Sequence, residues 1–79
     1  MSSKSNTALT TRIHGRTEKL LRIWLIDRDK ERAFNFFMRQ QPAFRLLILG
    51  VLMEVATAST DPQVARAGKD IPDYIKNKL

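Results

Sequence analysis

The chain has 79 residues, a net charge of +6, no cysteine and one histidine. A domain of this length buries only about 60% of the surface of its unfolded chain, so its core is thin unless a disulfide, a metal or a partner chain supplements it. The cysteine and histidine counts exclude a disulfide framework and a zinc cluster, and the acidic residues lack oxygen-ligand spacing. We therefore expect no metal and no cofactor, and an oligomer.

The positive charge is concentrated in the first 45 residues. This part has ten Lys and Arg residues against four Asp and Glu residues, whereas residues 46–79 have four of each. Such a basic half is typical of a chain that faces a polyanion, such as nucleic acid or an acidic protein. No apolar stretch approaches the roughly 20 residues that cross a bilayer, and the lack of cysteine fits a reducing compartment. We expect a cytoplasmic protein without a membrane partner.

Residues 1–16 form the first segment, a polar and basic arm that we expect to be flexible. The segment is rich in Ser and Thr and lacks the apolar run of a secretory signal. His14 has no catalytic partner near it in sequence, and the chain contains neither a Gly-rich phosphate loop nor a cysteine nucleophile. These observations predict that the protein is not an enzyme.

The next segment contains LLRIWLI, residues 20–26, which allows two interpretations. Its β-branched and aromatic residues favour a strand, and the charged run DRDKER at 27–32 interrupts any apolar helical stripe. The alternative is a helix that begins near Thr17 and places the leucines of the segment on one face. We take the strand as the first expectation and keep the helix open.

Residues 27–41 are expected to form a helix. Asp27 or Asp29 is suited to be its N-cap. The three phenylalanines of FNFF, residues 34–37, are interpreted as core residues, because helical spacing scatters them over more than one face and base stacking needs rings displayed together. Residues 40–42, Gln-Gln-Pro, separate this helix from the next.

Residues 42–58 form the clearest element, a second helix that begins at Pro42. Leu46, Leu49 and Met53 lie beside its main apolar stripe, so that most of the helix is apolar. A small domain cannot cover this much apolar surface, and each large side chain left in water forgoes about 1.5–3 kcal/mol. We therefore expect the main stripe to form a dimer interface, with six residues: Phe44, Leu47, Ile48, Val51, Leu52 and Val55.

Residues 59–79 form a C-terminal tail. Asp61 is suited to cap a short helix that starts at Pro62 and stops at Gly68. Tyr74 and Ile75 are expected to pack back on the domain, and the alternative is a tail that docks on a partner.

The order basic arm, strand, short helix, tight turn and apolar helix resembles the ribbon–helix–helix family of dimeric DNA-binding proteins. LLRIWLID stands where the family has its strand, RDKERAFNFFMRQ where it has its first helix and AFRLLILGVLMEVA where it has its second. In the order and spacing of these elements the chain is similar to the ParR/StbB-type plasmid partition proteins. The expected fold is thus a mainly α, ribbon–helix–helix-like dimer with a core domain over 17–58, and the alternative is an all-α domain of three or four helices.

The resemblance implies that paired strands of two subunits enter the major groove of duplex DNA. Arg22 would then read a base edge, and Arg45 would lie beside a helix N-terminus that receives a phosphate. The residues expected to contact nucleic acid are Arg12, Arg16, Lys19, Arg22 and Arg45.

Two functions are consistent with the sequence. The first is a small dimeric DNA-binding protein that acts as a repressor, a plasmid partition protein or an accessory factor of a mobile element. The second is an all-helical adaptor or inhibitor, encoded by a phage or plasmid, whose basic face and apolar helix bind a host protein. The second function predicts that residues 20–26 form no strand.

Overall fold

A computed structural model describes the backbone of residues 2–79 and the side chains of residues 9–79. Within this range the chain forms four helices and no strand. Helix α1 spans Ser2–Leu25, α2 spans Lys30–Met38, α3 spans Pro42–Ala58 and α4 spans Pro62–Lys78. The chain is therefore mainly helical, as expected, and it has the all-α architecture that was the alternative.

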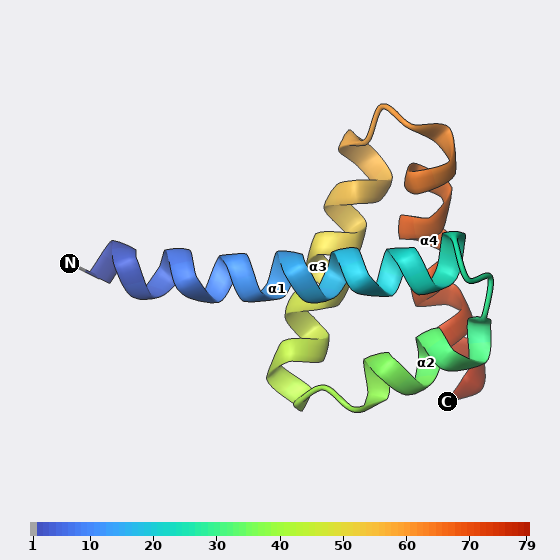
Figure 1. Cartoon of the computed structure of the whole chain (residues 1–79), viewed down its shortest axis with the longest axis horizontal. Coiled ribbons are helices and arrows are strands. Elements are labelled where there is room, and N and C mark those ends of the chain that lie inside the picture. The colour runs from blue at the N-terminus through green and yellow to red at the C-terminus, as the bar shows by residue number, and fades with distance from the viewer. Residues whose placement is uncertain (1) are drawn as a thin grey trace.

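Figure 1 shows how the helices are arranged. α3 and α4 form an antiparallel hairpin, and α1 crosses α3 and contacts α2, α3 and α4. α2 lies between the end of α1 and the start of α3. The first half of α1 extends beyond the other helices, which gives the molecule its long axis of 40 Å against 29 and 19 Å for the other two.

The core lies where the four helices meet, and every helix contributes to it. Its buried apolar residues are Ile13, Leu20, Ile23, Ala33, Phe37, Ile48, Leu52, Ala67, Ile71 and Ile75. The hydroxyl of Thr17 is also buried, where it donates a hydrogen bond to the Ile13 carbonyl oxygen at 2.8 Å. A buried polar group satisfied by its own helix adds little cost to the core.

The strand expected at residues 20–26 is not found, because α1 continues as a helix to Leu25. Ile13, Thr17 and Leu20 are buried at intervals of four and three residues, which is the spacing of one helix face. This stripe begins upstream of the segment that favoured a strand. Burial against α3 and α4 thus outweighs the β-propensity of the Ile and Trp residues.

The flexible arm expected over residues 1–16 and the helix end expected at Gly68 both differ from the structure. Residues 2–16 belong to the same helix as the following segment. In the tail, the helix continues past Gly68 and through Pro72 to Lys78. Ile71 and Ile75 continue the buried stripe of α4 across Pro72. The free energy gained by burying them offsets the loss of the backbone hydrogen bond that proline cannot donate.

Asp29 is the N-cap of α2, one of the two residues expected in this role. Its side chain accepts a hydrogen bond from the Arg32 backbone nitrogen at 3.0 Å. The preceding residue, Arg28, has φ +52°, a left-handed conformation that reverses the chain after α1. This tight turn brings α2 back alongside α1.

α3 buries one side of its apolar circumference within the chain. Ile48 and Leu52, expected in a dimer interface, are fully buried against the other helices. Phe44, Val51 and Val55 are half-buried, and Leu47 remains 43% exposed. In this fold the centre of the expected interface is therefore intramolecular core, because α1 and α4 cover it.

Candidate nucleic-acid interface

Four of the five cations expected to bind nucleic acid lie on α1. They follow one another at intervals of four, three and three residues: Arg12, Arg16, Lys19 and Arg22. At about 100° per residue these positions fall within an arc of roughly 120° on the helix. The helix thus brings Lys19 and Arg22, which a strand would have placed on opposite faces, together with Arg12 and Arg16 of the expected arm.

Arg16 is held between α1 and the start of α3. Its Nη1 donates a hydrogen bond to Oε1 of Gln40, and its guanidinium carbon lies 5.0 Å from the ring centroid of Phe44. Gln40 in turn donates from Nε2 to the Phe36 carbonyl oxygen at 3.0 Å. Arg16 therefore connects α1 with the start of α3, and these contacts hold its positive charge in position.

Lys19 is positioned by an aromatic ring of α2. Its Nζ lies 5.2 Å from the ring centroid of Phe36. Beside it a groove of about 400 Å³ runs between α1 and α2, and Arg32 of α2 and Arg39, the C-cap of α2, line this groove together with Lys19. The sequence analysis missed both arginines, although their seven-residue separation places them on one face of a helix.

Two ion pairs border the same region. Arg22 Nη2 lies 3.0 Å from Glu18 Oε1, and Arg32 Nη1 lies 3.5 Å from Asp27 Oδ2. All four side chains are exposed, so each pair is worth about 0–1 kcal/mol and is readily exchanged for another anion. Arg22 is exposed on a helix, so the base contact expected from a strand has no counterpart in this fold.

Arg45 is not part of this group. It lies in the first turn of α3, half-buried, with Nη1 3.6 Å from the Met38 sulfur. Its contact is with the end of α2 and not with α1. The structure thus brings four of the five expected residues together and places the fifth elsewhere.

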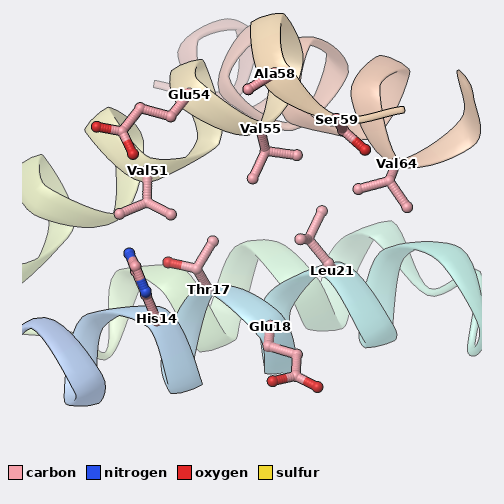
Figure 2. A pocket seen from close by; sticks show the side chains of 10 residues that line it. All are labelled: His14, Thr17, Glu18, Leu21, Val51, Glu54, Val55, Ala58, Ser59 and Val64. Carbon is pink, nitrogen blue, oxygen red and sulfur yellow. The ribbon is translucent and has the colours of Figure 1, made fainter. Parts of the chain in front are cut away.

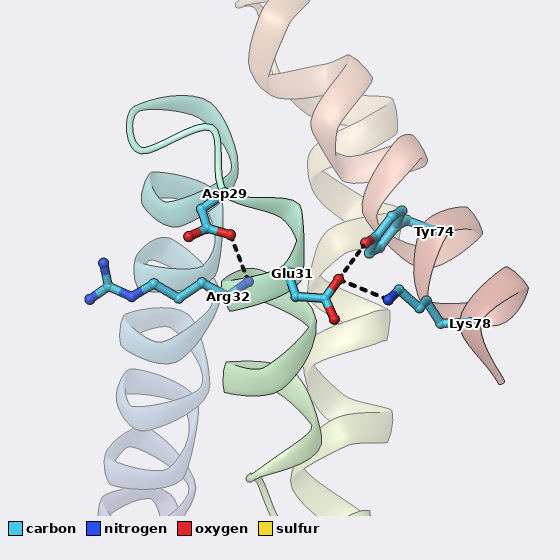
Figure 3. Close-up of polar contacts among 5 residues, drawn as sticks. All are labelled: Asp29, Glu31, Arg32, Tyr74 and Lys78. Atoms are coloured by element: carbon cyan, nitrogen blue, oxygen red, sulfur yellow. Dashed lines mark hydrogen bonds and ion pairs between the residues drawn. The ribbon is translucent and has the colours of Figure 1, made fainter.

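The carboxylate of Glu31, close to the basic groove, is held by α4. Glu31 Oε2 accepts a hydrogen bond from Lys78 Nζ at 2.8 Å and one from the Tyr74 hydroxyl at 3.5 Å. The hydrogen bond with Glu31 raises the pKa of Lys78 above its usual 10.5. Figure 3 shows Glu31 directed toward α4, whereas the Arg32 side chain points the other way. The Glu31 carboxylate is therefore directed to α4, whereas the carboxylates of Glu18 and Asp27 pair with cations of this region.

A second groove, of about 420 Å³, lies between α1 and the α3–α4 hairpin (Figure 2). Leu21, Val51, Val55 and Val64 give it apolar walls, and the carboxylate of Glu18 points away from it. Among side chains 9–79 no three or more His, Cys, Asp or Glu residues are grouped as metal ligands. His14 and Glu54 line the same groove, so its apolar walls are combined with two titratable side chains.

No described helix combines the length and the apolar character that crossing a membrane requires. Comparison of the chain with family models, with curated proteins and with solved structures found no match. The geometry of the cations is therefore the basis for a functional assignment.

Proposed function

We propose that the protein binds duplex DNA through a basic face formed by α1 and α2. This basic face consists of six residues: Arg12, Arg16, Lys19, Arg22, Arg32 and Arg39. The observation that carries the proposal is the gathering of four α1 cations on one side of the helix, continued across a groove by Arg32 of α2 and by Arg39 at the C-cap of α2.

The dimensions of α1 suit a duplex. The helix rises about 15 Å between Arg12 and Arg22, a distance equal to about four base-pair steps along the axis of a duplex. The first half of α1, which includes Arg12, projects beyond the other helices and can approach the duplex without a clash (Figure 1). Arg16, Lys19 and Arg22 lie on the second half, which packs beside α2 and α3. An α-helix also has the diameter that a major groove admits.

The cations of the basic face can bind DNA phosphates without losing strong contacts to the protein. The side chains of Arg12 and Arg39 are exposed and have no hydrogen-bond or ion-pair partner among the residues whose side chains the structure describes. Arg22 and Arg32 have only exposed partners, and replacing these with phosphates costs little. Phosphate contacts of this kind position the protein on DNA without reading the sequence. A repressor, a plasmid partition protein and an accessory factor of a mobile element all need this DNA-binding step.

A salt titration with random-sequence duplex tests the proposal. The affinity of the wild type should fall steeply with salt, because each neutralised phosphate contributes about 0.9 to the logarithmic slope. Arg12→Ala and Arg39→Ala should each weaken binding and reduce the slope by about 1. Arg66→Ala removes an exposed arginine from α4, outside the basic face, and should leave the slope unchanged.

Equal losses for Arg12→Ala and Arg66→Ala would show that net charge alone attracts the duplex, and the basic face would then have no special part. Absence of binding by the wild type at modest salt would reject the proposal as a whole.

The second candidate is the helical adaptor or inhibitor that binds another protein. The helical conformation of residues 20–25, where a strand was expected, favours it. Its expected signature is that no duplex is retarded at modest salt, whereas a partner protein is retained by the apolar surface of α3.

A further inference from the structure

α3 exposes an apolar face opposite the side that it buries. Leu46 is 72% exposed and Met53 is 68% exposed. Between and beside them lie three small residues, Ala43, Gly50 and Thr57, all exposed. We name these five residues the α3 seam. None of them carries a charge, so the seam is an apolar strip along a surface that is otherwise rich in charge.

The spacing of the α3 seam follows the heptad rule of helix pairs. Ala43, Gly50 and Thr57 are seven residues apart, and Leu46 and Met53 fill the intermediate positions. Small and large residues alternate along the seam, with Leu46 four residues before Gly50 and Met53 three residues after it. A twofold interface joins the same patch of two subunits, and an antiparallel pair centred on Gly50 sets Ala43 of one copy opposite Thr57 of the other.

Gly50 lies at the centre of the α3 seam and leaves a hollow there. A Cβ atom built on it would meet nothing within 4 Å, so its lack of a side chain serves no contact inside the chain. Glycine in a helix interior costs about 1 kcal/mol relative to alanine. A close approach of a second helix is a use for the residue that the single chain does not provide.

The surface area of the chain points the same way. Its accessible surface is 5810 Å². A compact monomer of this mass is expected to expose about 4,900 Å². The excess, about 900 Å², is close to the roughly 800 Å² that each partner contributes to a standard protein interface. The large apolar side chains of the α3 seam that are exposed, Leu46 and Met53, belong to this surface, and so does the projecting half of α1 (Figure 1).

We propose that a second copy of the chain packs on the α3 seam, with its own α3 antiparallel. Leu46 and Met53 of each copy then lie on either side of Gly50 of the other. Antiparallel packing sets the positive end of each helix dipole beside the negative end of its partner. The only charged residues of α3 are Arg45 and Glu54, and an antiparallel pair keeps each at a distance from its own symmetry mate. This dimer does not rest on the binding of DNA.

Sedimentation of purified full-length variants tests the interface. Leu46→Glu should raise the dimer dissociation constant roughly tenfold or more, because it places a charge in the seam. Ile26→Glu is the matched control, since Ile26 is 73% exposed but lies after α1 and outside the seam. It should leave the dimer intact, and circular dichroism should show equal helix content for both variants. A wild type that stays monomeric at 1 mM would overturn the proposal.

Gly50→Leu distinguishes close packing of two α3 helices from non-specific apolar association. The change adds apolar surface, so unspecific association would become tighter, whereas a close seam would be forced apart and the dimer weakened several-fold. Tighter self-association of Gly50→Leu would therefore contradict the proposal. Leucine is a better helix former than glycine, so the variant is expected to fold.

Disulfide trapping determines the orientation, because the chain has no cysteine of its own. An equimolar mixture of Ala43→Cys and Thr57→Cys chains should give the mixed disulfide on mild oxidation, because the antiparallel pair sets position 43 beside position 57 of the partner. Each variant alone should cross-link poorly. Cross-linking of each variant with itself and not with the other would indicate a parallel pair and reject the arrangement.

Discussion

A Cβ atom on Gly68 of α4 would lie 2.6 Å from the carbonyl oxygen of Leu52 on α3. It would also lie 2.9 Å from the Ala56 backbone nitrogen. Both neighbours are backbone atoms, so they cannot turn aside as a flexible side chain does. The α3–α4 hairpin is thus packed so closely that its crossing point admits only glycine.

Gly68→Ala is accordingly expected to destabilise the protein, by about 1–3 kcal/mol, because the methyl group must push the two helices apart. Gly15→Ala is the control, since a Cβ at Gly15 meets nothing within 4 Å and alanine is the better helix former. Gly15→Ala should stabilise by up to about 1 kcal/mol. Urea unfolding of both variants measures the difference, and a stabilised Gly68→Ala variant would contradict the close approach.

The two sides of α3 should differ sharply in their tolerance of truncation. Leu52 is fully buried and Leu46 is 72% exposed. Leu52→Ala should cost about 2–5 kcal/mol of unfolding free energy. Leu46→Ala should change it by less than about 0.5 kcal/mol at protein concentrations where the chain is monomeric. Equal effects would mean that the helix is rotated relative to the structure described above.

The helical pattern of residues 42–58 predicted the bounds of α3, since Pro42 marks its start and apolar residues recur along its length. The pattern could not tell which side is buried, because apolar residues occur around most of the helix. Ile48 and Leu52 were assigned to a dimer for this reason, and the position of α1 and α4 decides otherwise. That information lies in tertiary packing.

The candidate site was predictable in part. The cations of α1 were identified from the charge distribution, but their common face depends on a helix that the β-propensity of residues 20–26 concealed. A longer window shows the helix, because Ile13 and Thr17 continue the buried stripe toward the N-terminus. The contribution of Arg39 depends on α2 folding back beside α1, which no local pattern reveals.

The cap of α2 provides a test of the turn between α1 and α2. Asp29→Ala removes the acceptor of the Arg32 backbone N–H and should destabilise the protein by about 1 kcal/mol. Asp73→Ala removes an exposed carboxylate within α4 and should have little effect. Thermal unfolding of the pair separates the loss of a cap from the loss of a negative charge. Similar losses for both variants would argue against the capping role of Asp29.

The pKa of Lys78 gives a prediction at alkaline pH. The hydrogen bond with Glu31 raises this pKa above 10.5. The folded state therefore gains stability from the pair while Lys78 is protonated, and it loses this gain as the pH rises through the raised pKa. In Glu31→Gln the titration midpoint of Lys78, followed by NMR of its side chain, should move back toward 10.5. An unchanged midpoint would show that the pair in Figure 3 does not form in solution.

The binding of DNA by the basic face is the central claim, and NMR of the arginine side chains during titration with a random-sequence duplex tests it most directly. The Nε–Hε signals of Arg12, Arg16, Arg22 and Arg39 should shift progressively at low salt and return when salt is added. The signal of Arg66 should stay in place. Shifts centred on Arg66, or no shift of the α1 arginines at modest salt, would contradict the account.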